Sequence, residues 1–169
     1  MLGGHSEARQ AEFTAFVNTS ATYLTRTAFL LCGNEETAHD LVQETILRTY
    51  AAWWRVRPDD ARAYARRVLV NLNIDRRRRP PAVPTQTYDA PDSRDAEGRS
   101  DDRDQLRRML ASLPPLQRRV IVLRYFDDLT EVQVAECLGI GVGSVKSAAS
   151  RGLARIRTNF GPVLKEEKR

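Results

Sequence analysis

The stretch LTEVQVAECLGIGVGSVKSAASRGLARI, Leu129 to Ile156, decides how the C-terminal part of this chain folds. It predicts a short helix, a glycine-marked turn and a longer basic helix, which is the layout of a helix-turn-helix. Thr130 is a good N-cap, and Gln133 stands where it completes a capping box. Gly139 supplies a left-handed C-cap for the first helix. The stretch therefore predicts a module that places its second helix in the major groove of duplex DNA.

Helical spacing assigns an inward and an outward face to this module. The predicted inward residues are Val132, Ala135 and Leu138 in the first helix, and Val142, Val145, Ala149, Gly152 and Ile156 in the second. The predicted outward residues are Ser144, Ser147, Ala148, Arg151 and Arg155, flanked by Lys146 and Arg157. Hydroxyls and lysine bind phosphates, and arginine pairs with guanine. The plainer alternative is a helical hairpin whose basic face meets only water.

Composition and charge limit the remaining possibilities. The chain has 169 residues and a formal net charge of +5, which favours a polyanionic partner without identifying it. Cys32 and Cys137 each lie within a helical apolar pattern, so we expect two buried, reduced thiols and no disulfide or metal site. We find no signal-peptide core and no apolar run near the roughly 18 residues of a membrane span. A cytoplasmic protein without membrane insertion is expected.

The chain is predicted to be all-α, with two small helical domains, 7–79 and 102–160, joined by a flexible linker at 80–101. Alternating strand patterns are missing, and five helices are expected besides the helix-turn-helix, at 7–32, 35–54, 61–78, 103–112 and 115–126. The linker is rich in Pro, Asp, Ser and Gly and holds no core residues. Its acidic half carries Asp89, Asp92, Asp95 and Glu97, for which solubility is the simplest explanation.

Three motifs in order resemble a known family. They are DLVQETILRTY, then RAYARRVLVNLNIDRRRR, then, after the linker, LPPLQRRVIVLRYFDDLTEVQVAECLGIGVGSVKSAASRGLARIR. From Phe13 to Arg157 the chain resembles the extracytoplasmic-function (group IV) sigma factors of the sigma-70 family, and among them the SigE-type proteins of actinobacteria. The resemblance implies a promoter-specificity subunit of RNA polymerase with sigma region 2, a linker and sigma region 4. It also implies no catalytic residue, metal or other cofactor in the chain itself.

The resemblance also implies roles for particular residues. Binding to the beta-prime clamp helices of core polymerase would fall to Asp40, Leu41, Gln43 and Glu44. Recognition and opening of the minus-10 element would fall to Trp54, Arg62, Arg66, Arg67, Asn71, Arg76 and Arg77. Trp53 and Tyr64 lie on apolar stripes and are expected in the core instead. The helix at 116–126 would touch the beta flap, and the minus-35 element would be bound by Ser144, Lys146, Ser147, Ala148, Arg151 and Arg155.

One residue departs from the family pattern, and the resemblance implies a role for the linker. Many relatives have Arg or Gln where this chain has Ala148, and an alanine can contact a thymine methyl but cannot hydrogen-bond a base edge. The family also passes its linker through the RNA-exit path of the polymerase, where the acidic residues of this linker would mimic RNA.

Two other classes of function stay open at this point. A helix-turn-helix regulator would bind duplex DNA as a dimer and would need neither the first module nor the linker. An enzyme acting on nucleic acid would need a constellation of ligands or a nucleophile with its base, and we find none.

A sigma factor is expected to bind core polymerase and promoter DNA without forming homo-oligomers. An anti-sigma factor is a possible further partner.

Overall fold

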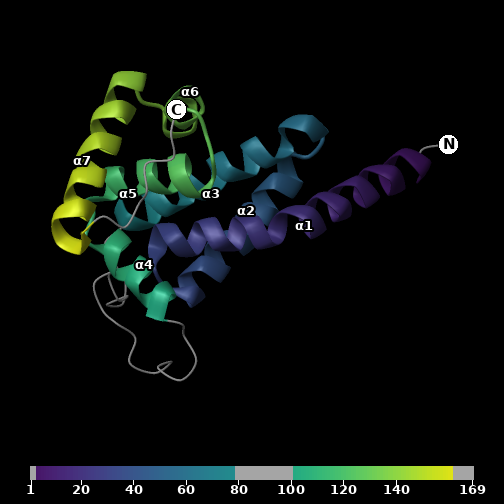
Figure 1. Ribbon diagram of the computed structural model, residues 1–169. Helices are drawn as coiled ribbons and strands as arrows, with labels where there is room; N and C mark the ends of the chain where they lie inside the picture. The colour runs from purple at the N-terminus through teal and green to yellow at the C-terminus, as the bar shows by residue number, and fades with distance from the viewer. Residues whose placement is uncertain (1–2, 79–100, 162–169) are drawn as a thin grey trace. The chain divides into compact units, whose positions relative to one another are not determined.

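The structure is a computed structural model that describes residues 3–78 and 101–161 (Figure 1). All regular structure in these two ranges is helical, as the sequence predicts. Contacts between Cα atoms divide the chain into two compact units, Met1–Pro80 and Pro81–Arg169. The acidic residues of the predicted linker lie outside the described residues, so their role remains a prediction.

The first unit is a bundle of three helices that pack against one another in every pairing. They are α1 (Gly3–Cys32), α2 (Glu35–Ala52) and α3 (Ala61–Arg78), and a 3₁₀ turn, Pro58–Asp60, leads directly into α3. Gly33 ends α1 at φ 74°, in the left-handed conformation that glycine adopts without strain. The side chain of Asn34 then caps α2 by accepting a hydrogen bond from the Thr37 amide at 2.8 Å.

The core of this unit combines aliphatic packing with a cluster of aromatic rings. Its buried aliphatic residues are Leu24, Ala28, Ala38, Leu41, Val42, Ala65 and Leu69. Nearby, the ring centroid of Phe13 lies 5.0 Å from that of Trp53 and 4.9 Å from that of Tyr50. Such tilted and edge-to-face pairs stabilise beyond the area that they bury. The expected core position of Trp53 is confirmed, since this side chain is buried.

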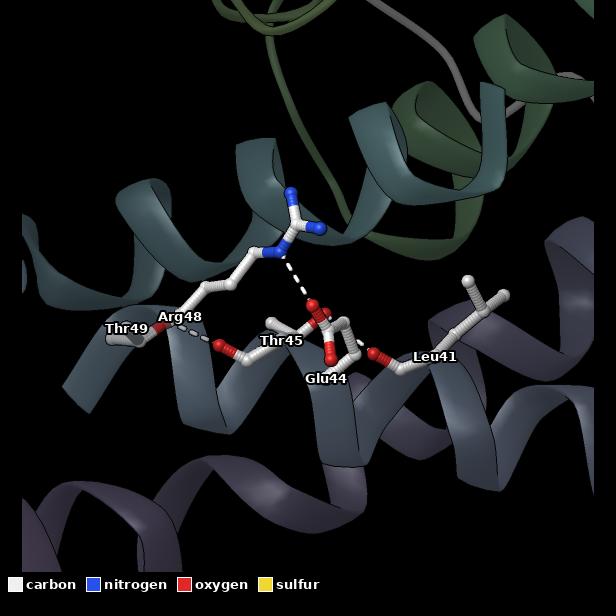
Figure 2. A network of polar contacts seen from close by, with 5 residues as sticks. All are labelled: Leu41, Glu44, Thr45, Arg48 and Thr49. Carbon is white, nitrogen blue, oxygen red and sulfur yellow. Dashed lines mark hydrogen bonds and ion pairs between the residues drawn. The ribbon is translucent and has the colours of Figure 1, made fainter. Parts of the chain in front are cut away.

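Helix α2 buries two hydroxyl groups without leaving them unsatisfied. Thr45 and Thr49 are fully buried, and each hydroxyl donates to the carbonyl four residues earlier, Leu41 and Thr45, at 2.7 Å (Figure 2). On the same helix Arg48 Nε pairs with Glu44 Oε1 at 2.7 Å. The helix therefore buries a polar stripe at little cost, because every hydroxyl hydrogen finds an acceptor within the helix.

The second unit contains α4 (Asp101–Ala111), α5 (Pro115–Ile121), a five-residue π-turn (Val122–Phe126), α6 (Glu131–Leu138) and α7 (Val142–Phe160). The sequence predicts one α-helix over 115–126, but its last five residues take the wider π-turn. Asp128 follows at φ 60°, and the guanidinium of Arg124 donates to the Leu129 carbonyl across this bend. The left-handed backbone of Asp128 and the Arg124 hydrogen bond fix where the chain enters α6.

A buried arginine closes the end of α4. Arg118 is only 4% exposed, and its guanidinium donates to the carbonyls of Leu110, Ala111 and Leu113 at 2.8, 3.2 and 3.0 Å. The last carbonyls of a helix have no partner inside the helix, and they favour a cation. Arg118 supplies both the donors and the charge, and so it joins α4 to α5.

The predicted caps of the helix-turn-helix are confirmed, but one predicted inward residue is not. The Thr130 hydroxyl accepts from the Gln133 amide at 3.2 Å, the Gln133 side chain accepts from the Thr130 amide at 2.9 Å, and Gly139 has φ 65°. Val132 was expected inside and is 55% exposed, whereas Val134 and Cys137 are buried. The residues that α6 buries are thus Val134, Ala135 and Cys137, of which the sequence predicts only Ala135 to face inward.

Candidate nucleic-acid interface

Helix α7 offers one cationic, hydroxyl-rich face. Ser144, Lys146, Ser147 and Arg151 are all exposed, as the sequence predicts. A surface hollow is lined by Lys146, Ser147, Ser150 and Arg151. Ser150 was missed in the sequence, because a serine between two alanine-rich turns carries no signal of its own. Arg151 Nε donates to the Ser147 carbonyl at 3.3 Å, which holds the guanidinium along the helix with its other nitrogens available to a ligand.

Ala148 is not on this face, and its assignment to DNA contact is wrong. It is completely buried, together with Val145, Gly152 and Ile156, while Ala149 is only half-buried. These buried residues are spaced three and four apart and form the stripe by which α7 packs against α5 and α6. A fully buried methyl group cannot reach a thymine, so Ala148 does not set the base preference of this helix.

Arg155 differs from Arg151 although both are exposed. Its Nη1 donates to the Ser112 carbonyl at 3.4 Å, in the turn between α4 and α5. The side chain therefore bridges α7 to the end of α4, and a nucleic acid would have to compete for it.

The arginines predicted at the minus-10 element all lie on α3, and some of them also contact a neighbouring helix. Arg67 and Asn71 are exposed, and Arg78, in the run of arginines at 76–79 that the sequence predicts to grip phosphates, continues the same helix face. Arg77 is also exposed. Arg76 lies beside α2, where its Nη1 is 3.5 Å from Asp40 Oδ2.

Arg62 and Arg66 both contact α1, although Arg62 stays exposed. The guanidinium of Arg62 lies 5.2 Å from the ring centroid of Tyr23, and its Nη2 donates to the Thr19 carbonyl at 3.3 Å. Arg66 is half-buried, and its Nη1 donates to the Tyr23 hydroxyl at 3.3 Å. Both arginines therefore help to fix α3 on α1, a role that helical spacing within α3 could not reveal.

The two adjacent tryptophans separate as the sequence predicts. Trp53 is buried, whereas Trp54 is 65% exposed just beyond the end of α2. The guanidinium of Arg55 lies 4.8 Å from the Trp54 ring centroid. An exposed indole next to cations is a surface on which an unpaired base can stack.

One of the polymerase-binding residues predicted on α2, Leu41, is wrong. Leu41 is 4% exposed and belongs to the core, so it cannot meet a partner. Asp40 and Gln43 are exposed, and Glu44 is half-exposed and paired with Arg48. The exposed apolar side chains of this helix are instead Leu47 and Tyr50, at 58% and 52%. With Gln43 and Trp54 they follow the spacing of a single helix face.

The thiols and carboxylates of the described residues show no reactive or metal-binding arrangement. Neither cysteine forms a disulfide; Cys137 is buried and Cys32 half-buried. Burial raises the pKa of the Cys32 thiol to about 11, which keeps it protonated at neutral pH. No group of three His, Cys, Asp or Glu side chains in the described ranges is placed to hold a metal. Likewise, none of the described helices has the length and apolarity needed to cross a bilayer.

Both units are similar in sequence to known proteins. The model of Sigma-70 region 2 matches residues 16–80, and that of Sigma-70, region 4 matches residues 103–156. The chain is 36% identical over 151 residues to the RNA polymerase sigma-E factor of Streptomyces coelicolor, covering 86% of this chain and 84% of that protein. It is 30% identical over 161 residues to the ECF RNA polymerase sigma factor SigE of Mycolicibacterium smegmatis, covering 89% and 62%.

Two solved structures share the fold. The sigma factor RpoE, in complex with the anti-sigma factor NepR from Bartonella quintana, matches with a TM-score of 0.71 and 21% identity over 86% of this chain and 94% of that one. CnrH, in complex with the cytosolic domain of CnrY, matches with a TM-score of 0.69 and 22% identity over 92% and 91%.

Proposed function

The chain belongs to the sigma-70 family, as an RNA polymerase sigma factor of the extracytoplasmic-function, SigE type, and we propose that it uses three helix faces to bind core polymerase and promoter DNA. The unit that contains α1 to α3 acts as region 2, and the unit that contains α4 to α7 acts as region 4. The observation that carries this proposal is that each unit exposes one cationic helix face. These faces consist of Arg67, Asn71 and Arg78 on α3, and of Ser147, Ser150 and Arg151 on α7.

The α7 face suits duplex DNA at the minus-35 element. Its hydroxyls and Lys146 are of the kinds that bind phosphate oxygens, and Arg151 has the fork geometry that recognises a guanine edge. The capped turn between α6 and α7 supports this role, because it fixes α7 relative to α6 without long side chains in between. A dimeric regulator is not favoured, because the relatives found by sequence are sigma factors and the matches extend through the first unit.

The α3 face, Trp54 and the loop at 55–60 suit the minus-10 element, where strands separate. Opening a duplex costs the stacking of each extruded base, and an aromatic platform with nearby cations offsets that cost. Trp54 and Arg55 provide this combination at the end of α2. Arg67 and Asn71 lie on the exposed side of the following helix and can contact the backbone of the same strand.

The exposed α2 face suits core polymerase. Interfaces draw most of their affinity from a few large side chains surrounded by polar contacts. Leu47 and Tyr50 are the large exposed residues here, and Asp40 and Gln43 lie in the preceding turns. Leu47 thus replaces Leu41 as the proposed apolar anchor on the beta-prime clamp helices. An anti-sigma partner is also proposed, supported by the complexes in which the similar folds were solved.

Reconstitution with core polymerase tests the proposal. The full chain should bind core and start transcription at discrete sites on genomic DNA, whereas core alone should not. Arg151→Ala should weaken initiation by about 5- to 100-fold, as expected for the loss of one base-contacting arginine. Arg108→Ala, which removes an exposed arginine from α4, is the matched control. Failure to bind core, or equal losses in the two variants, would contradict the assignment.

A further inference from the structure

One ion pair joins the two helices of the helix-turn-helix at the edge of the α7 face. Lys146 Nζ lies 3.6 Å from Oε2 of Glu131, the first residue of α6, and the two side chains are 63% and 37% exposed. Lys146 also lines the hollow formed with Ser147, Ser150 and Arg151. One cation of the proposed DNA face is therefore already paired with a carboxylate of the same unit.

We propose that Glu131 is a positioning residue that holds Lys146 back from DNA phosphates and so limits the sequence-independent affinity of the α7 face. The inference rests on the proposed function, because it presumes that α7 meets DNA. A phosphate oxygen and the Glu131 carboxylate compete for the same ammonium group. The carboxylate also repels an approaching phosphate, since both are negative.

The effect should be modest and dependent on salt. Pairs between exposed groups shift an equilibrium by up to about fivefold. Each cation that neutralises a phosphate adds about 0.9 to the slope of log affinity against log salt, because a counterion is released. Releasing Lys146 should therefore tighten binding at low salt and steepen that slope, whereas a general change in folding would leave the slope unchanged.

The test measures binding of the full chain to a labelled duplex that contains no promoter sequence, over a series of KCl concentrations. Glu131→Gln should tighten binding by about two- to fivefold at low salt and steepen the slope by up to about 0.9. Glu136→Gln is the matched control, since it removes an exposed carboxylate from the same helix. In a Lys146→Gln background the gain from Glu131→Gln should largely disappear, because the two changes are coupled.

A second variant separates the contact from the charge at the start of α6. Glu131→Asp keeps a carboxylate in the first turn, where it favours the helix, but draws it back from Lys146 by one methylene and so weakens the 3.6 Å contact. It should also steepen the salt slope.

These variants distinguish failure of the inference from failure of the proposed function. An equal gain from Glu136→Gln, or a full gain without Lys146, would overturn the role of Glu131. If Arg151→Gln weakens duplex binding but Glu131→Gln changes nothing, the inference fails and the proposed function stands. If Lys146→Gln and Arg151→Gln both leave binding to promoter and non-promoter duplexes unchanged, α7 is not the DNA face and the proposed function fails at this helix.

Discussion

Replacing Gly152 with alanine tests how closely α5 and α7 pack. A Cβ built on Gly152 would lie 3.0 Å from Cγ1 and 3.3 Å from Cδ1 of Ile121. Carbon atoms normally approach to about 3.5–4.0 Å, so the new methyl group is too close by several tenths of an ångström. Ile121 is completely buried and cannot swing into solvent.

Two opposing free energies decide the size of the effect. Alanine is favoured over glycine inside a helix by about 1 kcal/mol. Overpacking a core costs about 1–3 kcal/mol. We expect Gly152→Ala to lower the free energy of unfolding of the second unit by roughly 1 kcal/mol. Gly143→Ala is the matched control, since a Cβ built on Gly143 has no atom within 4 Å. It should raise that free energy by about 0.5 kcal/mol.

Hydrogen exchange of the α5 and α7 amides in the full chain measures this difference, because it reports the unit that contains them. Ile121→Val removes the Cδ1 atom, so it should cost less in the Gly152→Ala background than alone. Equal stabilisation by alanine at both glycines would refute the reasoning.

The remaining predictions concern four other side chains. Leu47→Ala should weaken core binding by about 5- to 100-fold in competition with the wild-type chain, and Val132→Ala, which trims an equally exposed apolar residue in the other unit, should not. Trp54→Ala should slow promoter opening on duplex templates by about 5- to 100-fold, and a template with a pre-melted minus-10 element should restore it; no rescue would remove Trp54 from melting. Arg118→Met should lower the free energy of unfolding by about 3 kcal/mol in urea titrations, because it removes charged donors from three carbonyls at and just beyond the end of α4, and an unchanged stability would mean that packing replaces them. Burial raises the pKa of the Cys32 thiol from 9.0 to about 11, so the folded state holds this proton more tightly than the unfolded state. The resulting contribution of Cys32 to the free energy of unfolding is complete below pH 9.0 and is lost as the pH rises through about 11. Urea midpoints at increasing pH should fall more steeply for the wild type than for Cys32→Ala, and parallel curves would contradict the shift.

Features that depend on neighbouring residues were predictable from the sequence. The capping box at Thr130, the left-handed Gly139 and the Asn34 cap each involve groups only a few residues apart. Residue type alone therefore determines them. The all-α class follows in the same way from helical periodicity.

Features that depend on distant residues were not predictable. Ala148 and Ala149 have the same side chain, and only the packing of α7 against its neighbouring helices decides which one is buried. Arg62 and Arg66 have the spacing of surface arginines, but their partner Tyr23 lies on another helix. On α2 both Leu41 and Leu47 are apolar, and only the bundle shows that Leu41 fills the core.

The buried stripe of α7 also limits how this protein can diverge. Val145, Ala148, Gly152 and Ile156 alternate with the exposed positions, and Gly152 tolerates no added atom without displacing Ile121. Substitutions on the exposed positions should therefore cost little stability, whereas those in the buried stripe disturb the packing of the unit. If the α7 face reads promoters, new preferences would arise through a handful of positions, chiefly 144, 147, 150 and 151, and each could change without rebuilding the domain.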